Sequence, residues 1–314
     1  MMRIVLSLPA DAESCWLELL RAALPGAQVL SRLWGQPVDP EAISADYVVA
    51  YGRCDTLFDE QRRMKAIFTL SAGVGHLLKM RNLPRDVPVI RLEDAGMAEH
   101  MVRYVLAAAL RFLQRLDVYA RQQRDAHWEQ HEPRSPSSIR VGVMGLGAIG
   151  AQVARALAAQ GFVVRGYARS ARNMDGVEVF AGESRFDAFL DDLDFLVCVL
   201  PATPATDGIL DRRSLSRLAN GAHLVNIGRG VSLVEEDLIA LLDSGKLGGA
   251  TLDVLRKEPL PSDHPFWRRP EIVVTPHISG LTVPETAVAQ IAGKIVRLER
   301  GESVTGVVAF ERGY

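Results

Sequence analysis

Cysteines are scarce in this sequence, and their placement narrows the possible functions. Only three occur, Cys15, Cys54 and Cys198, and their spacing matches no metal-ligand or redox motif. We therefore expect them to be buried side chains of a reduced protein, and the sequence predicts no bound metal.

An excess of one charge and long apolar runs are also missing. The formal net charge is −2 and no long basic run is present, so neither nucleic acid nor a membrane surface is favoured as the main partner. No run approaches the roughly 18 apolar residues that a membrane span needs. The apolar run near the first residue is too short for a signal peptide. With 48% hydrophobic and 24% charged residues, we expect an ordinary globular protein located in the cytoplasm.

Short apolar runs alternate with amphipathic stretches along most of the chain, whose 314 residues suggest about two domains. Strands that alternate with helices predict parallel sheets covered on both faces. The chain is expected to cross between two α/β domains near Met97 and to return near Pro284. Expected strands lie at residues 3–8, 45–51, 64–70, 87–92, 140–144, 162–167, 194–200, 223–227, 250–254 and 272–275, and the clearest helical patterns at 14–24, 97–128, 149–160 and 234–242.

A G-x-G-x-x-G segment joins the expected strand at 140–144 to a helix. Gly145 permits a tight turn, Gly147 lets a pyrophosphate approach the backbone, and Gly150 allows close helix–strand packing. The helix start, at Ala148 and Ile149, supplies N–H groups for the phosphates. Glycines alone are a weak signal, but the strand before them and the apolar helix pattern after them predict a dinucleotide-binding loop.

The end of the next strand indicates which nicotinamide cofactor is preferred. An NAD site usually places Asp or Glu about 20 residues beyond the loop, where it binds the ribose 2′-hydroxyl. Here Arg169, Ser170 and Arg172 follow the strand, so the carboxylate is missing and two guanidinium groups are available for a 2′-phosphate. We expect NADP(H) to be preferred, with NAD(H) possible.

Three ionisable residues, Arg229, Glu258 and His277, each follow an expected strand. Ligands bind at the carboxyl ends of strands in open α/β sheets, so these residues are expected to converge on one crevice. Hydride addition to a ketone builds negative charge on oxygen, which a proton donor and a fixed cation stabilise. His277 is the expected donor, Glu258 favours the imidazolium, and Arg229 can bind the carboxylate and keto oxygen of a 2-keto acid. Taken alone, an arginine is more often a surface charge, a glutamate a solvated loop residue and a histidine a satisfied structural residue. The occurrence of all three in this order after a dinucleotide loop indicates the chemistry.

Taken together, these motifs resemble those of the D-isomer-specific 2-hydroxyacid dehydrogenase family, over nearly the whole chain. The matching segments are Ser71-Ala-Gly-Val, Ala98-Glu-His, Gly145-Leu-Gly-Ala-Ile-Gly, Leu200-Pro-Ala-Thr-Pro-Ala-Thr, Asn226-Ile-Gly-Arg-Gly, Leu252-Asp-Val, Glu258-Pro-Leu and Thr275-Pro-His. Members that reduce glyoxylate and hydroxypyruvate are similar at Arg91-Leu-Glu-Asp-Ala-Gly-Met, Ala168-Arg-Ser and Glu311-Arg-Gly-Tyr.

The resemblance implies a role for each matching position. Arg229, Glu258 and His277 would form the catalytic set, and His277 would exchange the proton. Main-chain N–H groups would bind the substrate carboxylate as an anion nest, at Gly73, Val74 and Gly75. Many relatives carry Asp where this chain has Gly75. The cofactor contacts implied beyond the glycine loop are Leu200, Pro201, Ile227, Gly228 and, for the nicotinamide amide, Asp253.

The implied fold class is α/β, with two Rossmann-like or flavodoxin-like domains that have parallel sheets. Residues 1–97 and 285–314 would form the substrate-binding domain, and residues 98–284 the dinucleotide-binding domain inserted into it. Residues 111–128 would suit the contact of a homodimer, although packing within one chain explains their periodicity almost as well.

The expected activity is NADPH-dependent reduction of a small 2-keto acid such as glyoxylate or hydroxypyruvate. A dehydrogenase for another 2-hydroxy acid has the same catalytic set, because pocket shape decides that choice. Formate-type oxidation uses the same scaffold. A dinucleotide-sensing binding module resembling C-terminal-binding corepressors is the alternative outside enzymes, and turnover of a keto acid would distinguish it.

Overall fold

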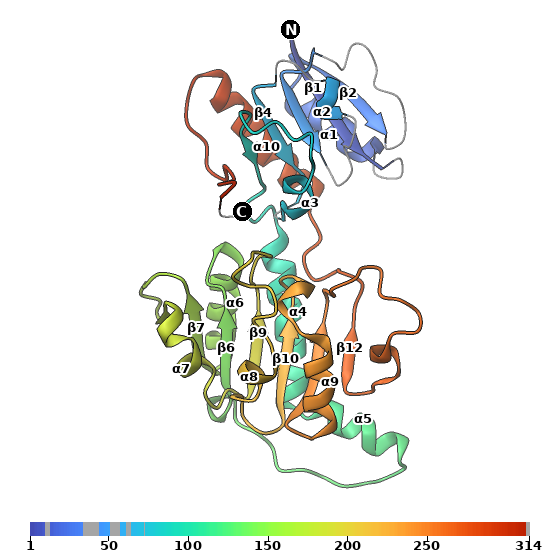
Figure 1. Ribbon diagram of the computed structural model, residues 1–314, viewed down its shortest axis with the longest axis vertical. Coiled ribbons are helices and arrows are strands. Elements are labelled where there is room, and N and C mark those ends of the chain that lie inside the picture. Colours follow the sequence, from blue (N-terminus) through green and yellow to red (C-terminus); the bar gives the residue numbers. More distant parts are fainter. Residues whose placement is uncertain (10–12, 34–43, 51–56, 61–63, 72, 312–314) are drawn as a thin grey trace. The chain divides into compact units, whose positions relative to one another are not determined.

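The computed structural model consists of two compact units, each described here by itself. It describes residues 1–9, 13–33, 44–50, 57–60, 64–71 and 73–311. Unit 1 contains residues 1–96 and 282–314, and unit 2 contains residues 97–281 (Figure 1). The expected boundary after residue 97 therefore lies after residue 96, and the one expected after residue 284 lies after residue 281.

Unit 1 is built on a parallel sheet of five strands in the order β2-β1-β3-β4-β5. This is the flavodoxin-like order, with β1 and β3 neighbouring each other where the winding reverses. Its elements are β1 (Met2–Leu8), α1 (Glu13–Ala23), β2 (Ala27–Leu33), β3 (Tyr47–Ala50), α2 (Leu57–Glu60), β4 (Ala66–Thr69), α3 (Gly75–Leu78), β5 (Val89–Ile90) and α10 (Pro284–Glu299).

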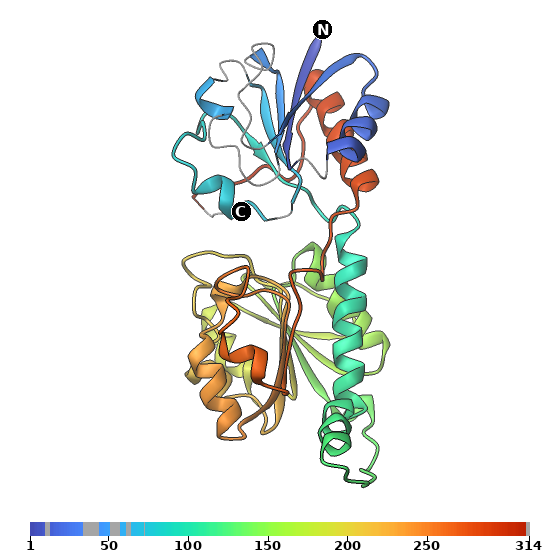
Figure 2. The same ribbon diagram turned by 90° about the vertical axis from the view of Figure 1, so that its right-hand side faces the viewer.

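Helices cover both faces of this sheet, and its central strands are buried between them. All four residues of β3 and all four of β4 are buried. Helices α1 and α10 pack side by side on one face (Figure 2). On the other face a core cluster joins the strands to α2 and α3, through Leu57, Phe58 and Leu77.

Unit 2 contains a parallel sheet of seven strands in the order β12-β11-β10-β9-β6-β7-β8. Its helices are α4 (Met97–Leu113), α5 (Leu116–Arg124), α6 (Ala148–Ala159), α7 (Phe186–Leu190), α8 (Arg212–Leu215) and α9 (Glu235–Asp243). Its strands are β6 (Arg140–Met144), β7 (Val163–Ala168), β8 (Val177–Ala181), β9 (Phe195–Cys198), β10 (Ala222–Asn226), β11 (Leu247–Leu252) and β12 (Ile272–Val274). Four short 3₁₀ turns lie between them at Pro136–Ser138, Glu183–Arg185, Gly230–Ser232 and Pro265–Arg268.

The strand order of unit 2 reverses between β6 and β9. Counted from β6, the order is that of the Rossmann fold, with one further strand at the β12 edge. Because loops on either side of such a reversal diverge, they leave a crevice at the carboxyl ends of β6 and β9. The predicted fold class, two α/β domains with parallel sheets, is confirmed.

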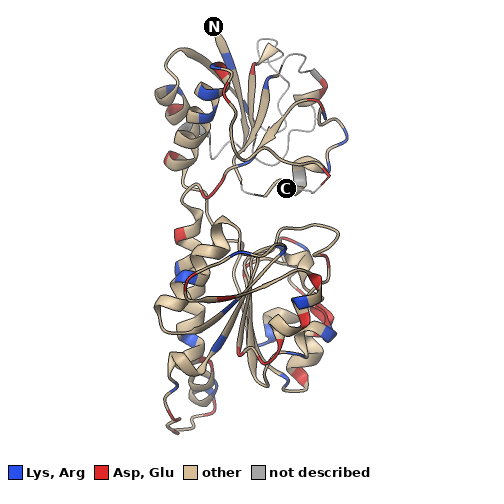
Figure 3. Ribbon diagram, turned by 90° about the vertical axis from the view of Figure 1, so that its left-hand side faces the viewer, with Lys and Arg blue, Asp and Glu red and all other residues tan. Residues whose placement is uncertain are grey.

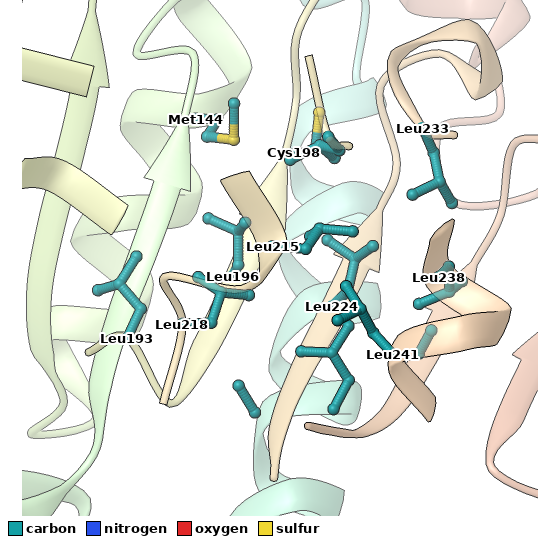
Figure 4. Packing of buried hydrophobic residues seen from close by; sticks show 14 of the residues in the cluster. Met144, Leu193, Leu196, Cys198, Leu215, Leu218, Leu224, Leu233, Leu238 and Leu241 are labelled. Carbon is teal, nitrogen blue, oxygen red and sulfur yellow. The ribbon is translucent and has the colours of Figure 1, made fainter. Parts of the chain in front are cut away.

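Alternate residues of each strand in unit 2 supply two separate cores. Leu196 and Leu224 point to the face covered by α7, α8 and α9, where apolar side chains interdigitate (Figure 4). Phe195 and Val225 point to the opposite face, covered by α4 and α6. Strands buried on both faces explain why their sequences are almost continuously apolar.

The structure corrects one expected helix and adds elements that the sequence did not predict. Residues 97–128 do not form a single helix: α4 ends at Leu113, Arg115 adopts a left-handed conformation (φ +53°), and α5 begins at Leu116. Leu116, the first residue of α5, is exposed. The strands β2 and β8 and the helix α10 were not predicted; both strands lie at sheet edges, where only part of each strand is buried.

The remaining general expectations have mixed outcomes. Cys198 is buried at the end of β9, but Cys15 on α1 is exposed, so the prediction of burial is wrong there. Cys54 lies outside the described residues. Basic and acidic residues are interspersed over the helices of both units (Figure 3). None of the helices in the described part of the chain combines the length and apolar composition needed to cross a bilayer.

Candidate active site

Five loops of unit 2 leave the sheet at the same level. Met144 of β6 pairs with Cys198 of β9, Cys198 with Asn226 of β10, Asn226 with Leu252 of β11, and Leu252 with Val274 of β12. Each is the last residue of its strand. The segments that follow therefore start side by side along one sheet edge, and they carry the glycine loop and all three predicted catalytic residues.

The glycine loop has the backbone geometry that its sequence requires. Gly145 adopts φ +96°, a conformation that L residues avoid, and its N–H donates to the carbonyl of Tyr167. A Cβ on Gly150 would lie 1.8 Å from the carbonyl oxygen of Gly145, so only glycine permits this close packing of α6 on the loop. Leu146 is buried and packs over Gly166 of β7. The inner side of the loop is thus fixed by its packing against α6 and β7.

Its outer side is open. A Cβ built on Gly147 would meet no atom within 4 Å, and Gly147 and Ala148 are exposed. Gly147 caps α6 without a side-chain hydrogen bond, which leaves the first N–H groups of a 12-residue helix, those of Ala148, Ile149 and Gly150, without intrahelical acceptors. An uncovered backbone beside unpaired N–H donors fits the pyrophosphate of a dinucleotide.

The residues expected at the 2′-phosphate lie beside this loop. Arg169 and Ser170 follow β7 directly and are exposed. Arg172 folds back, and its Nη1 donates to the carbonyl of Leu146 within the glycine loop. The end of β7 therefore presents cationic groups where an NAD site presents a carboxylate.

Arg229 is held in an extended segment after β10. Asn226 fixes that segment: its Nδ2 donates to the carbonyl of Arg229, and its Oδ1 accepts from the N–H of Gly228. The Arg229 guanidinium donates to the Gly228 carbonyl. Burial lowers the pKa of Arg229, and the nearby Glu258 carboxylate acts in the opposite direction. Arg229 is therefore a largely desolvated cation close to Glu258.

His277 and Glu258 form the predicted pair. His277 Nδ1 lies 2.8 Å from Glu258 Oε2, while Glu258 Oε1 accepts from the N–H of Leu255 at 2.9 Å. Glu258 is thereby oriented by the loop that carries it. With Nδ1 facing the carboxylate, the Nε2 side of the imidazole is left for a reacting group.

Asp253 holds the turn that carries His277. Its carboxylate accepts from the N–H groups of Ile278 and Ser279, each at 2.8 Å, and from Thr275 Oγ1 at 2.6 Å. The Asp253 side chain is buried. Its expected contact with the nicotinamide amide stays a prediction. Tyr104 on α4 completes the group, with its hydroxyl 2.6 Å from Thr275 Oγ1.

Sequence reasoning missed the supporting residues of this site. Thr275 was visible only as part of the Thr-Pro-His motif, and Asn226 only as part of the Asn-Ile-Gly-Arg segment. Tyr104 carried no signal, because its position on a helical face is that of any partly buried aromatic residue. Contacts between elements distant in sequence show Tyr104 and Thr275, and hydrogen bonds within the segment after β10 show Asn226.

Four further expected cofactor contacts lie in the loops after β9 and β10. A Cβ on Gly228 would lie 2.6 Å from the carbonyl oxygen of Leu200, so the two loops touch and Gly228 must be small. Leu200 is partly buried, Pro201 is exposed and Ile227 is buried. Ile227 therefore supports the loops, whereas Leu200 and Pro201 present surface.

The expected carboxylate-binding turn belongs to unit 1. Gly73 and Val74 precede α3, which begins at Gly75, and Ser71 Oγ donates to the carbonyl of Gly73 at 2.6 Å. Ala72 of the same motif lies outside the described residues, as do Arg312, Gly313 and Tyr314 of the terminal segment. The structure places this turn at the carboxyl end of β4, and its binding role stays a prediction.

Comparison with known proteins gives a consistent result. The family model for the NAD binding domain of D-isomer specific 2-hydroxyacid dehydrogenases matches residues 106–279. Glyoxylate/hydroxypyruvate reductase A of Serratia proteamaculans is 42% identical over 304 residues, which is 95% of this chain and 96% of that relative. The protein of the same description from Yersinia enterocolitica is 38% identical, with 100% of both chains covered.

Solved structures agree over the same length. A D-isomer specific 2-hydroxyacid dehydrogenase from Xanthobacter autotrophicus Py2, in complex with NADPH and MES, has a TM-score of 0.95 at 37% identity, covering 100% of this chain and 99% of that one. An NADPH-dependent glyoxylate/hydroxypyruvate reductase from Sinorhizobium meliloti, in complex with NADP and sulfate, has a TM-score of 0.90 at 33% identity, covering 100% of both chains.

Proposed function

Because this chain belongs to the D-isomer specific 2-hydroxyacid dehydrogenase family, we propose that it reduces small 2-keto acids with NADPH, and that glyoxylate and hydroxypyruvate are its substrates. One observation carries the proposal most directly. The hydrogen-bonded pair of His277 and Glu258, and the partly buried Arg229, lie on the same sheet edge as an open dinucleotide loop. The names of the relatives from Serratia and Yersinia support the choice of substrates.

The proposed chemistry divides between the cofactor and the chain. NADPH, when bound, supplies the hydride that adds to the keto carbon. His277 donates a proton from Nε2 to the keto oxygen, because its Nδ1 is held by Glu258. Arg229 binds the substrate carboxylate and stabilises the charge that develops on the keto oxygen. In the oxidative direction His277 accepts that proton.

The proposed binding residues follow from the open and cationic surfaces of the site. The N–H groups at Ala148, Ile149 and Gly150 would bind the pyrophosphate, for which the uncovered backbone at Gly147 leaves room. The 2′-phosphate is bound at the end of β7 by Arg169, Ser170 and Arg172, and Leu200 and Pro201 line the cofactor cleft. Main-chain N–H groups at Gly73, Val74 and Gly75 bind the substrate carboxylate.

The proposal is tested by cofactor oxidation with the purified protein at neutral pH. NADPH and NADH are offered in turn with glyoxylate, hydroxypyruvate and pyruvate. We expect rapid loss of NADPH with glyoxylate or hydroxypyruvate, and slower loss of NADH. If none of the three acids oxidises either cofactor, in protein shown by calorimetry to bind NADPH, the proposed function is wrong and the dinucleotide serves another role.

We further propose that the protein is a homodimer through the arm formed by α5 and the residues that follow it to 135. Trp128 is fully exposed, and Leu116 is 51% exposed. A second copy packed on the arm would cover these apolar side chains.

The dimer is tested by light scattering of the purified protein. The wild type should have twice the mass of the 34.4 kDa chain. Replacing Trp128 and Leu116 together with serine should shift that mass toward the monomer, whereas Trp267→Phe, at an exposed position outside the arm, should not. A monomeric wild type would rule out the dimer.

The finer expectations on partners and location also remain proposals. The interspersed charges favour small acids over nucleic acid, whose binding needs a concentrated basic surface (Figure 3). Use of NADPH and the unpaired thiols of Cys15 and Cys198 favour the reducing cytoplasm.

A further inference from the structure

Three side chains from distant parts of unit 2 form a chain of hydrogen bonds behind His277. The Tyr104 hydroxyl, on α4, lies 2.6 Å from Thr275 Oγ1, and Thr275 Oγ1 lies 2.6 Å from Asp253 Oδ1. A carboxylate only accepts, so Thr275 donates its one hydroxyl proton to Asp253. The Thr275 oxygen is then left to accept from Tyr104, which fixes the direction of the whole chain.

Asp253, which accepts the last of these hydrogen bonds, also holds the backbone of the turn that carries His277. The main-chain oxygen of Asp253 accepts from the N–H of His277 at 3.0 Å, Oδ1 accepts from Ile278 and Oδ2 from Ser279. Asp253 thus binds three consecutive amides. His277 needs this support because its φ is +56°, a conformation that disfavours an L side chain.

Of the three hydrogen-bonded side chains, Thr275 is the middle one and contacts both Tyr104 and Asp253. If its hydroxyl turns away from Asp253, Oδ1 loses one of its two donors and is free to rotate off the amide of Ile278. Tyr104 prevents that rotation because its donated bond fixes the Thr275 side chain. Burial raises the pKa of Tyr104 to about 12, so its hydroxyl stays protonated and donates throughout the neutral range.

We propose that Tyr104 is a positioning residue: its hydroxyl holds Thr275 against Asp253, and so keeps the turn that presents His277 to Glu258. The consequence for turnover rests on the proposed function of His277. The consequence for the backbone of residues 277–279 does not.

The first test is Tyr104→Phe, which removes one hydroxyl and keeps the ring. We expect kcat for glyoxylate reduction to fall on the order of tenfold, with KM and the Kd for NADPH within about twofold of wild type. In the protein without cofactor, hydrogen exchange of the amides of Ile278 and Ser279 should speed up by about tenfold. Exchange in β6 should not change, because a general loss of stability would affect both segments.

The matched control is Tyr47→Phe in unit 1. The Tyr47 hydroxyl also makes a 2.6 Å hydrogen bond, to Glu299 Oε1, and its ring is buried. Tyr47→Phe also removes one hydrogen-bonded hydroxyl from a tyrosine, but at a position outside the proposed site. We expect kcat and exchange at residues 277–279 to stay at their wild-type values in this variant.

Thr275 supplies a second, independent test. Thr275→Ser keeps the hydroxyl and should retain most of the wild-type kcat and exchange, whereas Thr275→Val should reproduce or exceed the defect of Tyr104→Phe. Because Tyr104 acts through Thr275, adding Tyr104→Phe to Thr275→Val should lower kcat less than about twofold further. Additive effects of the two changes would overturn the proposal.

The outcomes separate this inference from the proposed function. If the wild type reduces no keto acid but Tyr104→Phe speeds exchange at Ile278 and Ser279, the positioning of the turn is supported and the proposed function fails. If the wild type is active and Tyr104→Phe changes neither kcat nor that exchange, the positioning proposal is overturned and the proposed function stands.

Discussion

One added methyl group at either of two glycines tests whether the dinucleotide loop does what its geometry suggests. Gly147 has φ −70° and ψ −164°, which alanine adopts without strain, and a Cβ there meets nothing within 4 Å. The free energy of unfolding of Gly147→Ala should therefore stay within about 1 kcal/mol of wild type. The methyl group would nevertheless stand on the open side of the loop, where a pyrophosphate has to approach the backbone.

The expected effect on binding follows from that position. Displacing the pyrophosphate from the N–H groups of α6 weakens charge-assisted hydrogen bonds, which contribute roughly 1.5–3 kcal/mol each. We expect the Kd for NADPH to rise about 10- to 100-fold, which corresponds to about 1.4–2.8 kcal/mol. Gly150→Ala is the matched comparison, because its Cβ would lie 1.8 Å from a carbonyl oxygen and must displace backbone. It should lose about 2–4 kcal/mol of stability.

Two measurements on each variant decide the matter: urea unfolding of the protein without cofactor, and calorimetric titration with NADPH. The reasoning predicts opposite profiles, with Gly147→Ala stable but weak in binding and Gly150→Ala unstable. A Gly147→Ala variant that binds NADPH as tightly as wild type would refute the placement of the pyrophosphate over this residue. An unstable Gly147→Ala variant would refute the open geometry of the loop.

Three further predictions concern the cofactor, the chemistry and the pH dependence of stability. Replacing Arg169 and Arg172 together with alanine should weaken NADPH at least about tenfold more than NADH, measured as KM; equal losses would remove both residues from the 2′-phosphate site. His277→Ala should lower kcat at least about 100-fold with little change in KM, whereas Arg229→Ala should impair both; near-normal rates in His277→Ala would exclude it as proton donor. Burial lowers the pKa of His223 to about 4, so the unfolded chain takes up a proton between about pH 6.5 and 4 that the folded chain does not. The stability that His223 contributes is full above about pH 6.5 and declines through that window by up to about 3 kcal/mol. The free energy of unfolding of His223→Leu should decline less over the same range, and equal declines in both proteins would contradict the assignment.

The sheet edge that carries the candidate site was predictable because each strand and the residues after it form a recognisable local pattern in the sequence. Buried parallel strands read as continuous apolar runs, and several of these runs are followed closely by a polar residue or glycine. Gly145, Arg229 and His277 could each be placed just past such a run. Strand alignment then follows from the topology, since carboxyl ends of parallel strands share one edge.

The elements that were not predicted lack such a local sequence pattern. Only part of each of the edge strands β2 and β8 is buried, so their sequences mix polar and apolar residues without a clear period. The break between α4 and α5 depends on the left-handed Arg115, a residue type with no preference for that conformation. Apolar residues continue on both sides of the break, and their periodicity therefore suggests one helix.

In the candidate site, the residue types could be predicted from the sequence but the backbone geometry that positions them could not. The Thr-Pro-His motif identifies the proposed proton donor, but it does not encode the left-handed conformation of His277. That conformation persists because Asp253 binds the three amides of the turn, and Asp253 is itself held by Thr275 and Tyr104. The strain at His277 is therefore offset by bonds from the segments after β11 and β12 and from α4, and of these three only Thr275 is close to His277 in the sequence. A chain that kept every motif residue but had phenylalanine at position 104 would read as the same enzyme from its sequence, and should reduce keto acids more slowly.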